Sequence, residues 1–277
     1  MRKLLSTAAL AALFVSTSAL AAPANVSALQ GTITYKNSAS TGPYYYSPFA
    51  RVTSKVVYDS ATGTYTLRDT GNPLLTSTFG PGNISGSDAA FTYYSKSSGS
   101  TVETLRRLNQ SALNPLIVLS YVQYGQWRRS TTTSGVTSTN DTYVVFGTKT
   151  PGSAIPHGGS ASYSTYLDGT FVNKNGVYAV AGTGSLNAYF GSGTIDYSAT
   201  LTGTREGGGT NIAFGTTTGI GSIAYASAGF KGTGTTNGSG YKLDVNGNFY
   251  GPDYEEIGGI FRLTGNGGNG TGAIVGQ

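Results

Sequence analysis

The sequence predicts an all-β protein, in which an N-terminal β-rich domain over residues 22–150 precedes an eight-stranded antiparallel up-and-down β-barrel over residues 151–277. Short segments along the chain alternate apolar and polar residues with the period of two that half-buried strands show. The 42 glycines and 20 tyrosines indicate many short strands joined by tight turns. Because the chain has no cysteine, its stability must come from a packed core rather than from disulfides.

Residues 1–21 have the order of a secretory signal peptide. Arg2 and Lys3 precede the apolar stretch Leu4–Val15, and Ala19-Leu20-Ala21 forms an A-x-A cleavage site. The apolar stretch is too short for a spanning helix, so we do not expect a membrane-spanning protein. A lipid anchor on an N-terminal cysteine is excluded by the composition. We therefore expect a periplasmic or secreted protein that is not lipid-anchored through cysteine.

The two predicted domains differ in charge. Residues 22–150 hold ten Lys or Arg against five Asp or Glu, a net charge of +5, and residues 151–277 hold five against seven, a net charge of −2. This difference supports two domains, with the Pro- and Gly-rich segment 151–159 as their boundary. The basic residues are scattered rather than gathered in a dense stripe, so we expect no nucleic-acid partner.

The first domain begins with elements of clear strand character. Residues 22–30 are expected to form a flexible leader, and Gln30–Lys36 alternates as a first strand. The run Tyr44–Tyr46 lies between two prolines, which favours a loop or an edge strand. Arg51–Tyr58 and Thr64–Asp69 flank a Gly-containing turn, and together they predict a hairpin.

The rest of this domain is more varied. Phe91–Lys96 and Thr142–Gly147 predict strands, and Val102–Leu108 is expected to form a short helix or helical turn. The continuous apolar run Leu116–Leu119 predicts a fully buried strand that becomes half-exposed as it continues. Thr131–Thr142 is rich in Ser, Thr, Gly and Asn and predicts a surface loop.

Beyond the boundary, segments with strand periodicity recur at regular spacing and are joined by short Gly/Asn turns. The expected strands are Ala161–Val172, Val177–Phe190, Thr194–Gly203, Asn211–Phe214, Ile220–Phe230, Tyr241–Tyr250, Ile257–Thr264 and Thr271–Val275. Eight antiparallel strands in this pattern favour an up-and-down barrel, which leaves no exposed sheet edge. A barrel embedded in lipid is disfavoured because the chain ends in Val275-Gly276-Gln277, without a terminal aromatic residue.

Three motifs resemble one known family. Asn248-Phe249-Tyr250-Gly251-Pro252, followed by Glu255–Phe261, resembles the β-barrel domain of the transferrin-binding protein B-like family. Pro156–Gly169 resembles the first barrel strand of that family, and Leu119–Trp127 resembles a run in its N-terminal handle domain. The resemblance implies a β-rich handle domain before the barrel and the capture of host iron proteins or haem. Known members are typically surface lipoproteins, and the absence of cysteine favours a soluble, non-lipidated branch.

Eight residues of these motifs are expected to mark the fold rather than to bind a ligand: Trp127, Phe249, Tyr250, Gly251, Pro252, Gly258, Gly259 and Phe261. Gly251-Pro252 predicts a tight turn, because the proline ring fixes its φ angle. Gly258-Gly259 predicts a close strand approach or a kink. Phe249 and Phe261 are expected to be core aromatics on neighbouring strands.

The residues that catalysis or a resident metal would need are sparse. His157 is the only histidine, so a zinc site or a Ser–His–Asp triad lacks its usual partners. Asp253, Glu255 and Glu256 share one segment without the spacing of a calcium loop. Adjacent residues of an extended chain point to opposite faces, so Glu255 and Glu256 do not form the carboxylate pair of a glycosidase. We therefore expect no enzyme and no metal site.

The candidate ligand-binding residues are Tyr44, Tyr45, Tyr46 and His157. Haem iron takes His or Tyr as axial ligands, which makes these four the residues to test for haem, although no cofactor is required. A tyrosine cluster is equally suited to a protein-binding patch, because each ring offers contact area together with a polar hydroxyl. The alternative is that the tyrosines are ordinary surface aromatics and His157 is a solvated linker residue.

The favoured function is that of an exported, non-enzymatic binding protein of the bacterial envelope or exterior, which captures haem or an iron-carrying host protein. An outer-membrane transporter or a host iron protein is the expected partner, and a monomer is the expected state. The main alternative is a structural or adhesive surface protein with no small-molecule ligand, assembled through its Gly/Ser/Thr-rich strands. An enzyme and a lipid-embedded barrel are the remaining alternatives.

Overall fold

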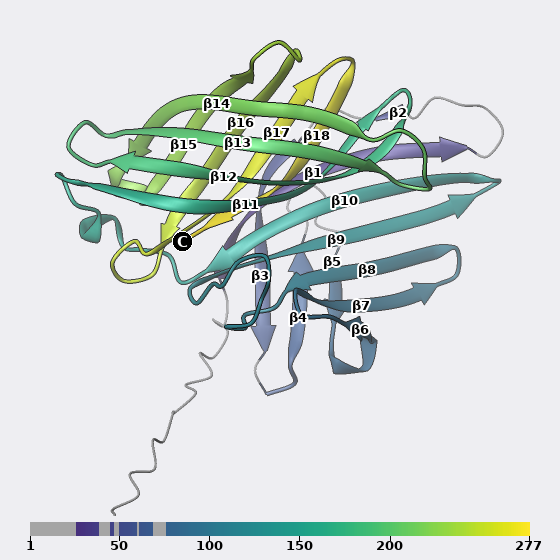
Figure 1. Ribbon diagram of the computed structural model, residues 1–277. Coiled ribbons are helices and arrows are strands. Elements are labelled where there is room, and N and C mark those ends of the chain that lie inside the picture. The colour runs from purple at the N-terminus through teal and green to yellow at the C-terminus, as the bar shows by residue number, and fades with distance from the viewer. Residues whose placement is uncertain (1–25, 39–44, 47–49, 60, 69–75) are drawn as a thin grey trace, which may run out of the picture.

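The computed structural model describes residues 26–38, 45–46, 50–59, 61–68 and 76–277. Within these residues the chain forms a curled antiparallel sheet and then a closed antiparallel barrel (Figure 1). The predicted fold class, an all-β handle followed by an eight-stranded barrel, is therefore confirmed. The predicted signal peptide and the residue Tyr44 lie outside the described residues. Within the part that the structure describes, no helix has the length and hydropathy needed to span a bilayer.

The handle consists of ten described strands, which pair in the order β5-β4-β3-β1-β10-β9-β8-β7-β6, with β2 also paired to β1. Their bounds are β1 Val26–Ser38, β2 Tyr45–Tyr46, β3 Ala50–Asp59, β4 Thr64–Arg68, β5 Thr76–Phe79, β6 Ile84–Ser87, β7 Phe91–Ser98, β8 Thr101–Leu108, β9 Val122–Thr133 and β10 Val136–Gly147. The predicted hairpin is β3 and β4. The first strand begins at Val26, so the last part of the predicted leader is a strand instead.

The handle sheet curls back over itself. Its edge strands β5 and β6 are joined only by the 3₁₀ turn Pro81–Asn83. The Ser77 hydroxyl on β5 donates to Glu103 on β8 at 2.7 Å, and Lys96 on β7 donates to the Thr78 carbonyl at 3.0 Å. The fold encloses a core that contains Trp127, the only tryptophan of the chain, which is 4% exposed.

Three predictions for the handle were wrong. Val102–Leu108 is not helical but lies in β8, because it finds two strand partners, β7 and β9. Thr131–Thr142 is not a loop but the end of β9 and the start of β10, joined by a tight turn in which Ser134 and Gly135 have positive φ. Leu116–Leu119 is not a strand but part of a loop, in which only Ile117 and Leu119 are buried.

The barrel lies wholly within the continuously described stretch and closes in the order β11 to β18. Its strands are β11 Ser160–Asn173, β12 Gly176–Tyr189, β13 Thr194–Arg205, β14 Ile212–Ala224, β15 Gly229–Thr236, β16 Tyr241–Tyr250, β17 Glu256–Gly265 and β18 Gly268–Gly276. The predicted number of strands is confirmed, but one boundary was wrong. The expected strands Asn211–Phe214 and Ile220–Phe230 are divided differently in the structure. Residues 212–224 form one strand, β14, with a bulge near Gly215, and Phe230 belongs to a separate strand, β15.

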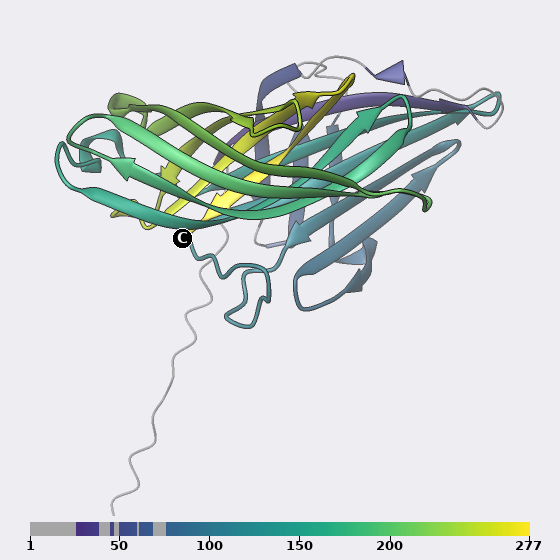
Figure 2. The same cartoon turned by 45° about the horizontal axis from the view of Figure 1, so that its top comes forward.

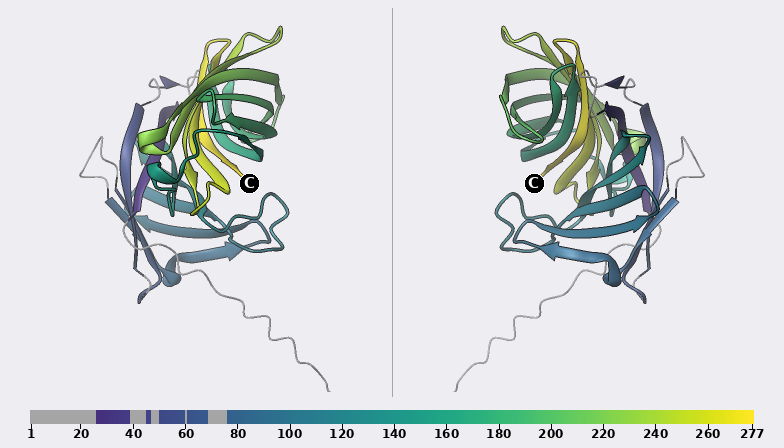
Figure 3. Two further views of the ribbon diagram at one scale, coloured as in Figure 1. Left: turned by 90° about the vertical axis from the view of Figure 1, so that its left-hand side faces the viewer. Right: turned by 90° about the vertical axis from the view of Figure 1, so that its right-hand side faces the viewer.

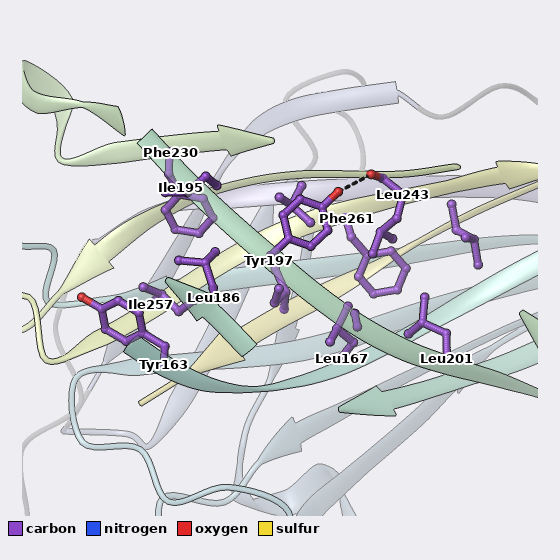
Figure 4. Packing of buried hydrophobic residues seen from close by; sticks show 14 of the residues in the cluster. Tyr163, Leu167, Leu186, Ile195, Tyr197, Leu201, Phe230, Leu243, Ile257 and Phe261 are labelled. Carbon is purple, nitrogen blue, oxygen red and sulfur yellow. Dashed lines mark hydrogen bonds between the residues drawn. The ribbon is translucent and has the colours of Figure 1, made fainter. Parts of the chain in front are cut away.

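Side chains from inward positions fill the barrel (Figure 4). One end is closed by edge-to-face aromatic rings, with centroids 5.1 Å apart for Phe171 and Phe214 and 4.9 Å for Phe214 and Tyr241. The other end holds Phe190, Phe230 and Phe249. Between them, the Tyr197 hydroxyl crosses the lumen and donates to the Leu243 carbonyl at 2.5 Å. Phe249 and Phe261 are both fully buried in this core.

The barrel packs against one face of the handle through β17 and β18 (Figures 2 and 3). Gly258 makes this approach possible, because a Cβ on Gly258 would lie 2.5 Å from a Val122 methyl and 2.8 Å from a Val145 methyl. Gly259 faces the barrel interior, where its Cβ would lie 2.5 Å from the Asn246 carbonyl. Each glycine of the pair therefore permits one close approach, one outside the barrel and one inside it.

Candidate binding surface

The structure places the predicted binding residues at separate positions. Tyr45 and Tyr46 form β2 and pair with Lys36 and Tyr35 of β1. His157 precedes β11, is exposed, and stacks on Tyr225 with ring centroids 4.5 Å apart and planes 21° apart.

The tyrosine pair and His157 are not brought together. Tyr35, the partner of Tyr46, clusters with Val172 near the end of β11, whereas His157 lies before its start. Twelve residues of extended strand between Ser160 and Val172 span roughly 40 Å. No single small ligand can therefore contact both.

A different segment, the loop of residues 109–121 between β8 and β9, presents apolar side chains to solvent. Leu113 is 86% exposed and Leu116 is 37% exposed. In the same loop, Ile117 and Leu119 are buried against the barrel-facing core of the handle. An isolated exposed leucine needs no explanation, but two of them on an anchored loop form a surface suited to a partner.

Hydrogen bonds hold this loop in shape. The buried Asn114 amide donates to the Ala90 carbonyl at 3.1 Å and to the Asn109 carbonyl at 2.8 Å, while its oxygen accepts the Leu116 N–H at 3.0 Å. The Ser111 hydroxyl accepts the Leu113 N–H at 3.2 Å. The backbone on both sides of the exposed leucines is thus fixed before any partner arrives.

The end of the loop is fixed to the barrel by Glu256. Its Oε1 accepts the N–H of Ser120 at 2.5 Å, and its Oε2 accepts those of Tyr121 at 2.9 Å and Val122 at 2.8 Å. Burial raises the pKa of the Glu256 carboxyl, and the three N–H donors oppose that shift. Glu256, considered above only as an acid or a calcium ligand, is therefore a clasp between β17 and the loop.

A hollow of about 550 Å³ lies beside Leu113, with Asp88, Arg107 and Asn109 among its lining residues. Asp88 Oδ1 accepts the N–H groups of Ala90 and Phe91, and its Oδ2 accepts the Tyr93 hydroxyl at 2.8 Å. These hydrogen bonds lower the pKa of Asp88, and the bond from the Phe91 N–H has the largest effect. A fixed carboxylate and a guanidinium, from Asp88 and Arg107, therefore lie next to the apolar tip of the loop.

Behind this surface, charged residues tie the handle to the barrel. Arg106 Nη2 donates to both oxygens of the buried Asp168 on β11, at 2.8 and 2.7 Å, and the Tyr124 hydroxyl donates to the same carboxylate. Burial raises the pKa of Asp168, and the Arg106 charge opposes the shift.

A second arginine bridges the two parts. Arg128 contacts the fully buried Asp141 of the handle at 2.6 Å and Glu206 of the barrel at 2.7 Å. These ion pairs hold the two parts in one relative position, which in turn fixes where the loop points.

Sequence reasoning missed the loop of residues 109–121. The run Leu116–Leu119 looked like one buried strand, and no pattern separates Leu116, which is exposed, from Ile117 and Leu119, which are buried. The usable clue was Asn114-Pro115, a dipeptide that starts turns. Among the described residues, no group of three or more His, Cys, Asp or Glu is placed to hold a metal ion.

No protein-family model matches the sequence, and no curated protein is matched. The chain is similar to the solved structure of transferrin binding protein B from serogroup B Neisseria meningitidis, with 19% identity and a TM-score of 0.47 over 89% of this chain and 43% of that one. It thus spans less than half the length of that protein.

Two further solved structures are similar. One is a double mutant of transferrin binding protein B from Haemophilus parasuis, with 13% identity, a TM-score of 0.45, and 92% of this chain and 76% of that one covered. The other is the N-lobe domain of lactoferrin binding protein B of Moraxella bovis, with 14% identity, a TM-score of 0.41, and 89% and 99% covered.

Proposed function

We propose that this chain is an exported, non-enzymatic binding protein that captures a protein partner through the loop of residues 109–121. The single observation that carries this proposal is Leu113, 86% exposed at the tip of a loop whose backbone is hydrogen-bonded on both sides and clasped to the barrel. Function is commonly carried by loops that a rigid scaffold holds in place.

The energetic argument is one of preorganisation. Ordering a loop on binding costs free energy, and a loop already held by Asn114 and Glu256 avoids most of that cost. Burying one leucine side chain in a partner contributes about 1.5–3 kcal/mol. Leu113 with Leu116, rimmed by Asp88 and Arg107, has the apolar centre and polar rim of a small protein-binding site.

The filled barrel also favours binding on the outside. Aromatic side chains occupy both ends of the lumen, and Tyr197 crosses its middle. The barrel therefore acts as a support that positions the handle, and the contact surface lies on the loops.

The resemblance of the segment around Phe249 suggests the class of partner, a host iron-carrying protein such as transferrin or lactoferrin. The test is to immobilise the mature protein and measure binding of human transferrin and lactoferrin, each with and without iron. Leu113→Ala is expected to weaken binding about tenfold, the equivalent of about 1.4 kcal/mol, and Leu113→Asp more strongly.

The matched control is Val102→Ala, on β8, where Val102 is 46% exposed and lies away from the loop. It should leave binding unchanged. Absence of binding to either iron protein would remove the proposed partner class. Binding that survives Leu113→Asp would remove the proposed surface.

Haem is tested on the same protein by titration with hemin. His157 is exposed, and its ring stacks on that of Tyr225. This arrangement offers an imidazole but does not enclose a macrocycle, so it does not favour haem at His157. A Soret shift abolished by His157→Ala, or by replacing Tyr44, Tyr45 and Tyr46, would assign haem to those residues.

A further inference from the structure

The outer wall of the barrel carries a groove that the proposed protein-binding loop does not use. Two adjoining hollows, of about 500 and 440 Å³, lie on the outside of β12 to β17 and share Ile220 and Thr233. Ile220 is 74% exposed between them. Neighbouring strands lie about 4.8 Å apart, so the part from β12 to β15 extends for roughly 14 Å.

The groove exists because β14 and β15 have glycine at four inward positions. A Cβ on Gly219 would collide with the Tyr197 ring, and one on Gly232 would lie 2.9 Å from the same ring. Cβ atoms on Gly221 and Gly234 would collide with the backbone of the adjacent strand. The backbone of these two strands therefore lies directly against the Tyr197 ring and the adjacent strand, and the outer surface is hollowed above it.

The lining of the larger hollow is polar and almost uncharged, whereas the adjoining hollow is lined by Lys231, Asp244 and Arg262 among others. Of the described residues that line the larger hollow, Asp196 alone carries a charge, and most of the others are hydroxyl or amide residues such as Ser185, Asn187, Thr218 and Thr235. A carboxylate without a basic neighbour repels phosphates and other anions. Hydroxyl and amide groups both donate and accept hydrogen bonds, which matches a ligand that does the same.

A hydrogen-bonded chain fixes the polar groups at one end of the groove. The Ser162 hydroxyl donates to Asn187 Oδ1 at 2.7 Å, and Asn187 Nδ2 donates to Asp196 Oδ1 at 2.7 Å. The Tyr189 hydroxyl donates to Asp196 Oδ2 at 2.8 Å, and the residue is 41% exposed. Each Asp196 oxygen keeps a free lone pair, and the tyrosine ring adds a flat apolar surface beside them.

We propose that the larger hollow of this groove binds a neutral oligosaccharide. Vicinal sugar hydroxyls would bond to Asp196 and Asn187, and a pyranose ring would lie against Tyr189 or Ile220. An extended peptide is the other ligand of suitable shape, but it recognises sheets mainly by pairing with a free strand edge. The barrel is closed, so the strands under the groove already have partners on both sides.

The experiment uses the mature protein and a panel of neutral oligosaccharides built from glucose, galactose, mannose and N-acetylglucosamine, followed by calorimetry on those that bind. Thr218→Trp fills the groove from an exposed position, and Asp196→Ala removes the central acceptor. Each is expected to weaken binding by about tenfold or more. Thr202→Trp, also exposed on the barrel exterior but outside both hollows, is the control and should bind as the unchanged protein does.

The outcomes decide the assignment. Far-UV circular dichroism and thermal melting of each variant establish that the fold is retained. If no neutral oligosaccharide binds more tightly than about 1 mM, or if binding survives Thr218→Trp, the groove is not a saccharide site. Binding of peptides from a random library that Thr218→Trp abolishes would also overturn the proposal. Because Leu113 lies outside the groove, loss of saccharide binding and loss of protein binding are separable.

Discussion

Removal of the Glu256 carboxylate tests the clasp between the barrel and the binding loop. In Glu256→Ala, the N–H groups of Ser120, Tyr121 and Val122 lose their acceptor. Ser120 is exposed and gains water instead, whereas Val122 is fully buried and Tyr121 is half-buried. A hydrogen bond to a charged group contributes about 1.5–3 kcal/mol.

Two such bonds, less the recovered cost of burying the charge, give an expected loss of roughly 3 kcal/mol in the free energy of unfolding. That is a large part of the 5–15 kcal/mol typical of a domain. Glu256→Gln should lower the free energy of unfolding less than Glu256→Ala does. Its amide oxygen still accepts a hydrogen bond, although its amide nitrogen would face an N–H donor. The neighbouring Glu255 is exposed and accepts the Asp253 N–H, so Glu255→Ala is the matched control.

Urea unfolding at neutral pH measures the effect, followed by circular dichroism and by the fluorescence of Trp127. Trp127 is buried in the handle, so its emission reports that part separately from the barrel. The control should stay within about 0.5 kcal/mol of the unchanged protein. If Glu256→Ala were equally neutral, the three hydrogen bonds would contribute nothing measurable and the description of the clasp would fail. Weaker partner binding should accompany the loss of stability, because the loop loses its anchor.

Three further predictions concern packing and ionisation. Gly258→Ala forces the barrel away from the handle and should lower the free energy of unfolding in urea by about 1–3 kcal/mol. The control Gly158→Ala, with no atom within 4 Å of the new Cβ, should leave it unchanged. Equal effects of the two substitutions would contradict the close approach at Gly258. Burial raises the pKa of Tyr250 from 10.0 to about 12, so its contribution to stability is complete below pH 10 and is lost as the pH rises to about 12. Unfolding that begins well below pH 10, measured by circular dichroism, would refute this. Tyr93→Phe removes a donor to Asp88 and should raise the pKa of Asp88 toward its ordinary value in a carboxyl NMR titration; an unchanged pKa would show that the backbone donors suffice.

Predictions from the local sequence pattern were wrong where pairing with distant strands decided the secondary structure. Val102–Leu108 pairs with β7 and β9, and two ladders outweigh any helical tendency of the segment. β15, with the sequence Gly-Phe-Lys-Gly-Thr-Gly-Thr-Thr, has few apolar residues because two of its inward positions, Gly232 and Gly234, are glycines. Periodicity of apolar residues could not reveal it, since the Tyr197 ring occupies the space that its side chains would fill.

The sequence likewise indicated some of the important residues and missed others. The sequence singled out Phe249, Phe261 and Gly258, whose roles depend on residue type: two rings fill a core, and an absent side chain permits contact. It could not single out Leu113, because exposure of a leucine depends on how the neighbouring loop backbone is hydrogen-bonded. Nor could it show that Glu256 accepts three N–H groups from residues more than 130 positions away.

By itself the sequence determined the class of structure: strands from alternation, turns from glycine, a closed barrel from eight regular segments, and a core without disulfides. These are local properties, since each follows from the residue types within a few positions. Only the tertiary structure decided how the handle and barrel meet, which loop is held outward, and where the barrel wall is hollowed. Those features arise from contacts between segments far apart in the chain, such as Glu256 with Val122 and Tyr197 with Gly219, which no local pattern encodes.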